Sequence, residues 1–105
     1  MIGRIWHGWT SSQNADAYEA LLKEEIFAGI QNLKISGFNG IELFRRDLGT
    51  EVEFITLMRF DSLIAVRVFA GEDYEVAVVP QKARELLLHF DERSQHYEIV
   101  DSIPK

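Results

Sequence analysis

The chain has 105 residues, of which 47% are hydrophobic and 11% aromatic, and it carries a formal net charge of -6 with a pI near 5.0. A chain of this length is expected to form one domain, residues 1–105, and to bury roughly two-thirds of the surface that its unfolded form exposes. The negative charge gives no long-range attraction to phosphate, so we expect no nucleic-acid partner. Because there is no cysteine, disulfides, thiolate metal sites and cysteine nucleophiles are excluded.

The apolar content also bears on partners and location. It exceeds what so small a core can hide, so some apolar surface is expected to meet another subunit or to enclose a ligand, and a homodimer is the expected arrangement. The N-terminus lacks a basic region followed by an apolar run, and no stretch approaches the roughly 20 apolar residues that cross a bilayer. We therefore expect no membrane partner and a cytoplasmic location.

The first two predicted elements are a strand and a helix. Residues 2–9 alternate between two faces that each carry a tryptophan, Trp6 on one and Trp9 on the other, which predicts a strand covered on both sides. A polar break follows, with Thr10 and Asn14 as alternative helix caps. The apolar residues that then recur at helical spacing are Tyr18, Leu21, Leu22, Ile26, Ile30 and Leu33. They predict one amphipathic helix that frays near Gly29 or a few residues later.

The middle of the chain predicts a hairpin and a second helix. Turn residues at 36–40 precede a strand over 41–47, and a short connection at 48–50 leads into residues 51–60. That second strand alternates with a period of two and is apolar on much of both faces, which predicts a central strand. Asp61 or Ser62 can cap a helix over residues 63–70 that ends at Gly71.

The last third predicts a short turn, a helix and a closing strand. Asp73 can cap a short turn through residues 74–79, and Pro80 suits the first position of a helix lined on one side by Ala83, Leu86, Leu87 and Phe90. Residues 95–101 form the final strand. This order is the split βαβ arrangement of an α+β, ferredoxin-like fold, with helices on one face of an antiparallel sheet. The other face still carries apolar groups, and a second copy of the chain is the simplest partner for it.

Four segments resemble a known family. They are Arg-Ile-Trp-His-Gly-Trp-Thr at 4–10, the Gly-Phe-Asn-Gly turn at 37–40 ahead of residues 44–46, the run at 53–62, and residues 90–98. Together they resemble the antibiotic biosynthesis monooxygenase superfamily of dimeric α/β barrels, most closely a bacterial branch without settled function. The resemblance implies two ferredoxin-like sheets that face each other in a homodimer, first and last strands side by side, and a cavity between sheet and helices.

The superfamily holds cofactor-independent quinone-forming oxygenases, haem-degrading oxygenases and proteins with no known reaction. The haem-degrading branch uses an Asn on the first strand, a Trp after the central strand and a His on the next helical segment. This chain has His7, Phe60 and the residues near 75–79 at those places. The departure speaks against haem, and no cofactor is expected.

An oxygenase without a cofactor needs a base near the substrate hydroxyl, a cation for the developing oxyanion and an apolar slot with aromatic walls. His7 or His96 is a candidate base and Arg67 a candidate anion-binding residue. The candidate walls are Trp6, Phe54, Phe60 and Tyr97. The alternative interpretation makes His96 and Glu98 a solvated edge pair and turns Arg67 outward beside Asp61.

Two other sets of charged residues carry weaker signals. His7, His96 and Glu98 are a conceivable metal-binding set on adjoining strands, but their spacing predicts it only weakly and no metal is expected. Glu53 is expected to pair with Arg45 or Arg46 across the hairpin rather than to act as a catalytic acid.

Two functions remain open at this level, so the sequence does not decide whether the protein is an enzyme. The first is a cofactor-independent monooxygenase that acts on a small aromatic or polyketide-like molecule. The alternative is a non-catalytic dimeric module, stress-related or binding a small hydrophobic ligand.

Overall fold

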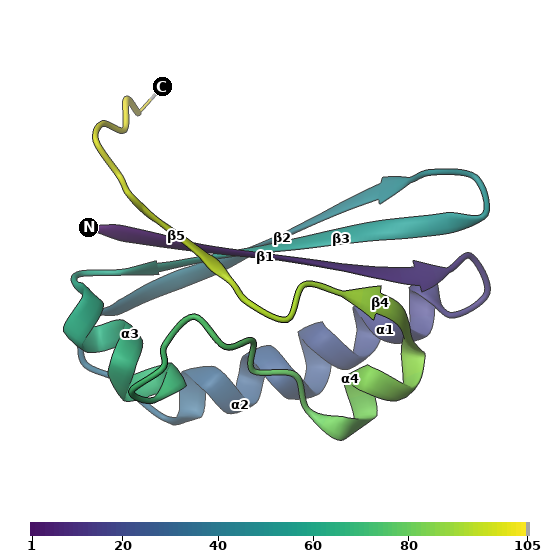
Figure 1. Ribbon diagram of the computed structural model, residues 1–105, viewed down its shortest axis with the longest axis horizontal. Helices are drawn as coiled ribbons and strands as arrows, with labels where there is room; N and C mark the ends of the chain where they lie inside the picture. The colour runs from purple at the N-terminus through teal and green to yellow at the C-terminus, as the bar shows by residue number, and fades with distance from the viewer. Residues whose placement is uncertain (105) are drawn as a thin grey trace.

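The computed structural model describes residues 1–104, which form a five-stranded antiparallel sheet with helices on one face (Figure 1). The strands are β1 (Ile2–Ser11), β2 (Phe38–Asp47), β3 (Glu51–Phe60), β4 (Leu87–Phe90) and β5 (Gln95–Glu98). The helical segments are α1 (Ala15–Leu21), η1 (Leu22–Ile26), α2 (Phe27–Asn32), α3 (Leu63–Ala70) and α4 (Gln81–Leu86). The predicted α+β, ferredoxin-like fold is confirmed.

The strand order is β2-β3-β1-β4, and β5 pairs with the same edge of β1 as β4 does. β4 pairs with residues 8–10 of β1 and β5 with residues 2–5, so the first and last strands are neighbours, as the resemblance implied. Trp6 lies opposite Thr56, and Arg4 lies between Met58 on one side and His96 on the other. The even-numbered residues of β1, β3 and β5 therefore share one face of the sheet.

The long amphipathic helix is continuous from α1 to α2 but has a π-helical turn, η1, at its centre. Asn14 occupies the N-cap position, whereas Thr10 belongs to β1. The helix ends at Asn32, within the expected range. Leu33 was predicted on the apolar side but is 63% exposed, because it lies just beyond the last helical residue.

The helix predicted from Pro80 to Phe90 is wrong in its second half. α4 ends at Leu86, and Leu87 turns to an extended conformation (φ -84°, ψ 138°) that begins β4. The free edge of β1 supplies the reason, since Leu87 pairs with Thr10 and His89 with Trp9. His89 is therefore a strand residue, and its ring stacks on Trp9 with the centroids 4.5 Å apart.

The core between sheet and helices has two clusters of buried residues. One comprises Trp6, Ala15, Tyr18, Leu22, Val52, Phe54 and Ala83, and the other Met58, Phe60, Ala65 and Val66. Ser62 caps α3 by accepting a hydrogen bond from the Ala65 amide at 3.4 Å, and Gly71 (φ 94°) ends that helix as predicted. None of the helices in residues 1–104 is long and apolar enough to cross a membrane.

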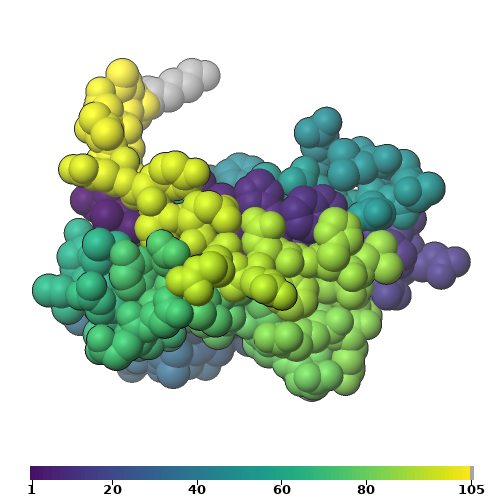
Figure 2. All heavy atoms as spheres, in the orientation of Figure 1, coloured from purple at the N-terminus to yellow at the C-terminus, as the bar shows by residue number. Residues whose placement is uncertain are grey.

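The second face of the sheet has no helix over it (Figure 1). It carries the odd-numbered residues of β1 and β3, among them Ile5, Ile55 and Leu57, which are half-buried. Beyond β5 the chain runs past this face, and Figure 2 shows the yellow part of this segment standing clear of the body of the molecule. Val100 and Ile103 on that segment are 90% and 87% exposed.

Candidate functional site

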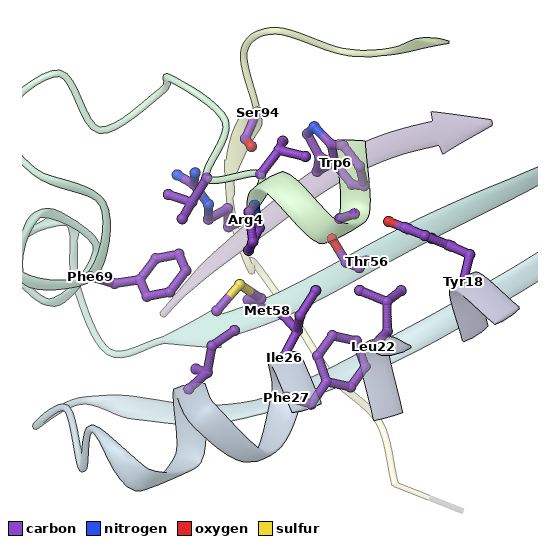
Figure 3. A pocket seen from close by; sticks show the side chains of 15 residues that line it. Arg4, Trp6, Tyr18, Leu22, Ile26, Phe27, Thr56, Met58, Phe69 and Ser94 are labelled. Carbon is purple, nitrogen blue, oxygen red and sulfur yellow. The ribbon is translucent and has the colours of Figure 1, made fainter. Parts of the chain in front are cut away.

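A cavity lies between the sheet and the helices, where the two core clusters meet (Figure 3). The cavity has a volume of about 60 Å³, within a space of about 510 Å³ that includes open solvent. The lining residues are Arg4, Trp6, Tyr18, Leu22, Ile26, Phe27, Ile30, Thr56, Met58, Phe69, Val78, Val79, Pro80, Ala83 and Ser94. The π-helical turn η1 contributes Leu22 and Ile26 to this lining, and such turns are frequent at functional sites.

Arg4 is the charged residue of the lining, and it is 3% exposed. Its Nη1 donates to the Tyr74 carbonyl and to His96 Nε2 (2.9 Å), and its Nη2 donates to the Val76 carbonyl (3.2 Å). The guanidinium carbon also lies 5.6 Å from the centroid of the Phe69 ring. Burial lowers the pKa of Arg4 to about 10, which still leaves the side chain charged at neutral pH.

His96 lies beside Arg4 on β5 and faces the same side of the sheet. An arginine N–H can only donate, so His96 Nε2 is the acceptor and the proton of the neutral ring is on Nδ1. Nδ1 is buried and has no hydrogen-bond partner within residues 1–104. Burial first, and the charge of Arg4 second, lower the pKa of His96, so the ring is neutral at pH 7.

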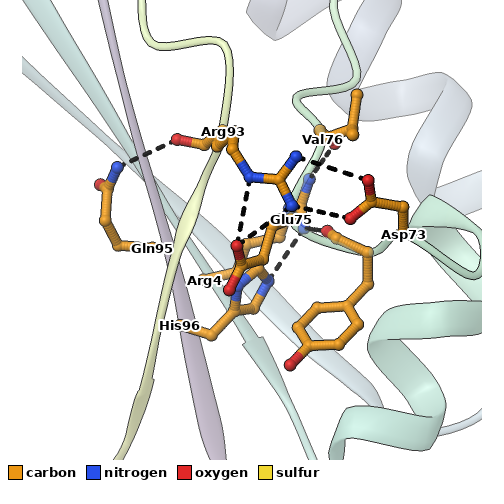
Figure 4. Close-up of polar contacts among 8 residues, drawn as sticks. Arg4, Asp73, Glu75, Val76, Arg93, Gln95 and His96 are labelled. Atoms are coloured by element: carbon orange, nitrogen blue, oxygen red, sulfur yellow. Dashed lines mark hydrogen bonds and ion pairs between the residues drawn. The ribbon is translucent and has the colours of Figure 1, made fainter.

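The segment that follows α3 lies over the Arg4 end of the cavity (Figure 4). Arg93 binds Asp73 at 2.8 Å and Glu75 at 3.2 Å, and the amide of Ala77 donates to the Glu92 carbonyl at 2.9 Å. The turn that Asp73 was expected to begin extends only to residue 76, because the chain then bridges to Arg93 as extended backbone. Arg4 from inside and Arg93 from outside thus hold residues 73–77 in place.

Three hydroxyl groups complete the polar part of the lining: those of Tyr18, Thr56 and Ser94. Tyr18 is 1% exposed, and its ring meets Phe54 edge-on with the centroids 4.9 Å apart. Burial raises the pKa of Tyr18, so its hydroxyl stays protonated and can donate a hydrogen bond. The rest of the lining is mostly apolar.

The structure does not bring all the predicted catalytic residues together. His96 lies beside the cavity, but His7 is on the uncovered face of the sheet, where its Nδ1 is 3.1 Å from a Glu53 carboxylate oxygen. Arg67 is exposed on α3, and its guanidinium carbon is 5.4 Å from the Tyr74 ring centroid. Since His7 and His96 lie on opposite faces, the conceivable metal set of these two with Glu98 does not form, and residues 1–104 contain no group of three metal-ligating side chains.

The predicted aromatic walls also separate. Trp6 lines the cavity, and its indole N–H donates to the Asp91 carbonyl at 2.7 Å. Phe54 and Phe60 are fully buried in the two core clusters beside the cavity. Tyr97 is 57% exposed and occupies the uncovered face.

The expected hairpin ion pair of Glu53 takes a different form. Arg46 lies opposite Glu53 in the register, but the Glu53 carboxylate binds His7. Arg45 faces the helices and binds Asp16 at 2.8 Å and Glu19 at 3.1 Å. The pairing across β2 and β3 is therefore replaced by contacts to β1 and α1.

Sequence reasoning missed four polar residues of the lining: Arg4, Tyr18, Thr56 and Ser94. For Arg4 a signal existed, because it shares a strand face with Ile2 and Trp6, and an arginine on the helix-facing side of an interior strand requires partners in the core. Ser94 had no such signal, since its burial depends on how the segment before β5 folds back over residues 75–77.

The fold places this chain in a structural class, that of ferredoxin-like α+β proteins, and here a cavity lies between sheet and helices. No family model and no curated protein matches the sequence. Among solved structures, the chain is similar to a Bacillus cereus protein that bears the provisional name antibiotic biosynthesis monooxygenase. The TM-score is 0.71 at 12% identity over 99% of this chain and 97% of the other. The protein therefore has the same fold as that structure.

Proposed function

We propose that the cavity is the catalytic site of a cofactor-independent monooxygenase whose substrate is a small, electron-rich phenol. The observation that carries the proposal is the pair of Arg4 and His96, a buried cation next to a neutral imidazole at the polar end of an apolar cavity. The fold of the Bacillus cereus protein supports the same class of reaction.

The proposed reaction converts a phenol with a free ring position into a quinone. Phenol itself and one molecule of O2 would yield one benzoquinone and one water, so one oxygen atom enters the ring and the other leaves with the two hydrogens that the phenol loses. The phenolate passes an electron to O2, and Arg4 stabilises the phenolate and the oxyanions that follow. His96 Nε2 is able to accept the phenol proton once the substrate oxygen has taken its place on Arg4 Nη1. His7 and Arg67 have no role in this scheme, because His7 is on the uncovered face of the sheet and Arg67 is exposed on α3, away from the Arg4–His96 pair.

The size of the cavity limits the substrate. A buried cavity that binds benzene has a volume on the order of 150 Å³, whereas the cavity here has about 60 Å³. An aromatic ring must therefore also use the space that is open to solvent, and Val78 and Pro80 are exposed residues of the lining. A single ring fits this space better than a polyketide of several fused rings.

Oxygen uptake with a panel of phenols and hydroquinones tests the proposal. We expect uptake above the buffer rate and, with ¹⁸O-labelled O2, one labelled oxygen in the quinone formed from a phenol. His96→Gln should remove most of the activity, whereas His89→Gln, which changes an exposed strand histidine, should retain it. Uptake equal to that of buffer across the panel refutes the proposal.

The second candidate is a non-catalytic module that binds a small hydrophobic ligand. The observation in its favour is that His96 Nε2 already accepts a hydrogen bond from Arg4, so the closed site offers no free base. In this case a phenol binds but is recovered unchanged after incubation with O2, and His96→Gln leaves its affinity within a factor of about two.

We also propose that two copies pair through the uncovered face of the sheet. The support is an apolar surface over several strands, formed by Ile5, Trp9, Phe44, Ile55, Leu57 and Tyr97, with no helix over it. Native mass spectrometry should then give twice the 12.1 kDa chain mass. A monomer at micromolar concentration contradicts this arrangement.

A further inference from the structure

Arg4 is a buried positive charge that has no carboxylate partner among residues 1–104. Its three hydrogen-bond partners, the Tyr74 and Val76 carbonyls and His96, are all uncharged. No Asp or Glu oxygen within residues 1–104 lies within 4.0 Å of its nitrogens. An unpaired charge in the interior costs far more than a paired one, so a group that brings negative charge to Arg4 is strongly favoured.

The acidic residues on either side of Tyr74, whose carbonyl binds Arg4, are not free to supply that negative charge. Asp73 and Glu75 flank Tyr74, but both carboxylates bind Arg93 on the outer side of the segment (Figure 4). Arg93 brings one positive charge to two negative ones, so the cluster keeps a net charge of -1, but its carboxylates are 65% and 47% exposed and water screens them. Neither carboxylate contacts Arg4, so an anion in direct contact with the guanidinium has to come from the cavity.

Arg4 also has hydrogen-bond donors left for such an anion. A guanidinium has five N–H groups, and the contacts within residues 1–104 use three of them. Both hydrogens of Nη1 are used, so the Nε hydrogen and one Nη2 hydrogen remain. The Nε hydrogen lies on the edge of the planar group that Nε shares with Nη2, which is an edge at which a guanidinium can bind a carboxylate.

The remainder of the cavity fits an apolar body. Next to Arg4 the lining is formed by Trp6, Met58 and Phe69, and beyond them by aliphatic side chains of η1 and α2. Figure 3 shows Arg4 between Phe69 and Trp6, with the hydroxyls of Tyr18 and Thr56 farther along the cavity. A cavity with a cationic end and an apolar body fits a ligand that has an anionic group at one end and an apolar remainder.

We infer that the cavity binds a small organic anion, with its carboxylate or enolate oxygens on the free edge of Arg4 and its apolar part against Trp6, Met58 and Phe69. The inference rests on the proposed function only in taking this cavity as a ligand site. It differs from the proposed function in the charge of the ligand. The ligand is an anion before it binds, so His96 does not have to remove a proton from it.

Calorimetry in oxygen-free buffer at pH 7.5 tests the inference, because no turnover interferes there. The probes are two matched pairs of different size, benzoate with benzamide and isobutyrate with isobutyramide. Within a pair the shape is nearly constant and the charge changes. We expect at least one carboxylate to bind about tenfold or more tightly than its amide, since charge-assisted bidentate hydrogen bonds are stronger than neutral ones.

Two variants assign the preference to Arg4. Arg4→Met keeps length and apolar bulk and should abolish it, whereas Arg46→Met removes an exposed charge of the same type on β2 and should leave it unchanged. If Arg4→Met does not fold, the comparison within each pair on the unaltered protein still decides. Equal affinity for carboxylate and amide, no carboxylate binding at all, or a preference that survives in folded Arg4→Met overturns the inference.

The two proposals fail separately. A protein that prefers carboxylates but takes up no oxygen with phenols keeps the anion site and loses the monooxygenase. A protein that oxidises phenols but binds carboxylate and amide equally keeps the monooxygenase and loses the anion site.

Discussion

The substitution Gly8→Ala is expected both to destabilise the protein and to disturb the cavity. Gly8 and Trp6 project from the same face of β1, and a Cβ at Gly8 would lie 2.6 Å from Trp6 Cη2, 2.9 Å from Trp6 Cζ3 and 3.1 Å from Leu87 Cδ2. The indole cannot move away freely, because it is 8% exposed and its N–H is bonded to the Asp91 carbonyl. Trp6 or β4 must shift instead.

The size of the effect follows from overpacking in cores, which costs about 1–3 kcal/mol. For a domain of this length the melting temperature of Gly8→Ala should fall by about 4 to 24 °C, since each kcal/mol corresponds to about 4–8 °C. Thermal unfolding followed by circular dichroism measures the change, and the emission of Trp6 should shift in the folded variant because its ring moves relative to the cavity.

Gly29→Ala is the matched control. Gly29 is exposed in α2 with nothing within 4 Å of a Cβ, so the same chemical change should raise stability by about 0.4–1 kcal/mol. If Gly8→Ala melts at or above the temperature of the unaltered protein while Gly29→Ala behaves as expected, the packing of Trp6 against β1 described above is wrong.

Three further outcomes are expected. Because the pKa of His96 is lowered in the folded protein, the unfolded chain binds more protons near and below the ordinary histidine value of 6.5. The free energy of unfolding should therefore fall as the pH drops from 7.5 to 5.5. Urea unfolding at the two pH values should show a smaller fall for His96→Gln than for His89→Gln. Arg93→Met should speed hydrogen exchange at the Ala77 amide by severalfold while leaving the β3 amides unchanged, because Arg93 holds residues 73–77 from outside; equal exchange rates argue against that role. Ile55→Glu on the uncovered face should convert a dimer to a folded monomer in native mass spectrometry, whereas Lys23→Glu on the helical side should not.

Local patterns were sufficient for most elements. The period of two over residues 51–60 and the cap at Ser62 are signals within a few residues, and β3 and α3 formed where they predicted. The residues of the site were harder to predict from the sequence, because the pairing of strands that are distant in the sequence decides which side chains line the cavity. His7 and His96 were equivalent candidates by residue type, and the register of β1 with β3 and β5 placed them on opposite faces.

The sequence by itself thus determined the fold class, since hydrophobic periodicity and turn residues act locally and leave few ways to order a strand, a helix and a hairpin. The tertiary structure alone decided that Leu87–Phe90 is a strand, because its hydrogen-bond partners are Gly8 to Thr10, about 80 residues away. It alone also decided that Arg4 rather than Arg67 is the cation of the cavity. An arginine on a strand and one on a helix carry the same charge, and burial against Phe69, Tyr74 and His96 is what makes the first a candidate binding residue.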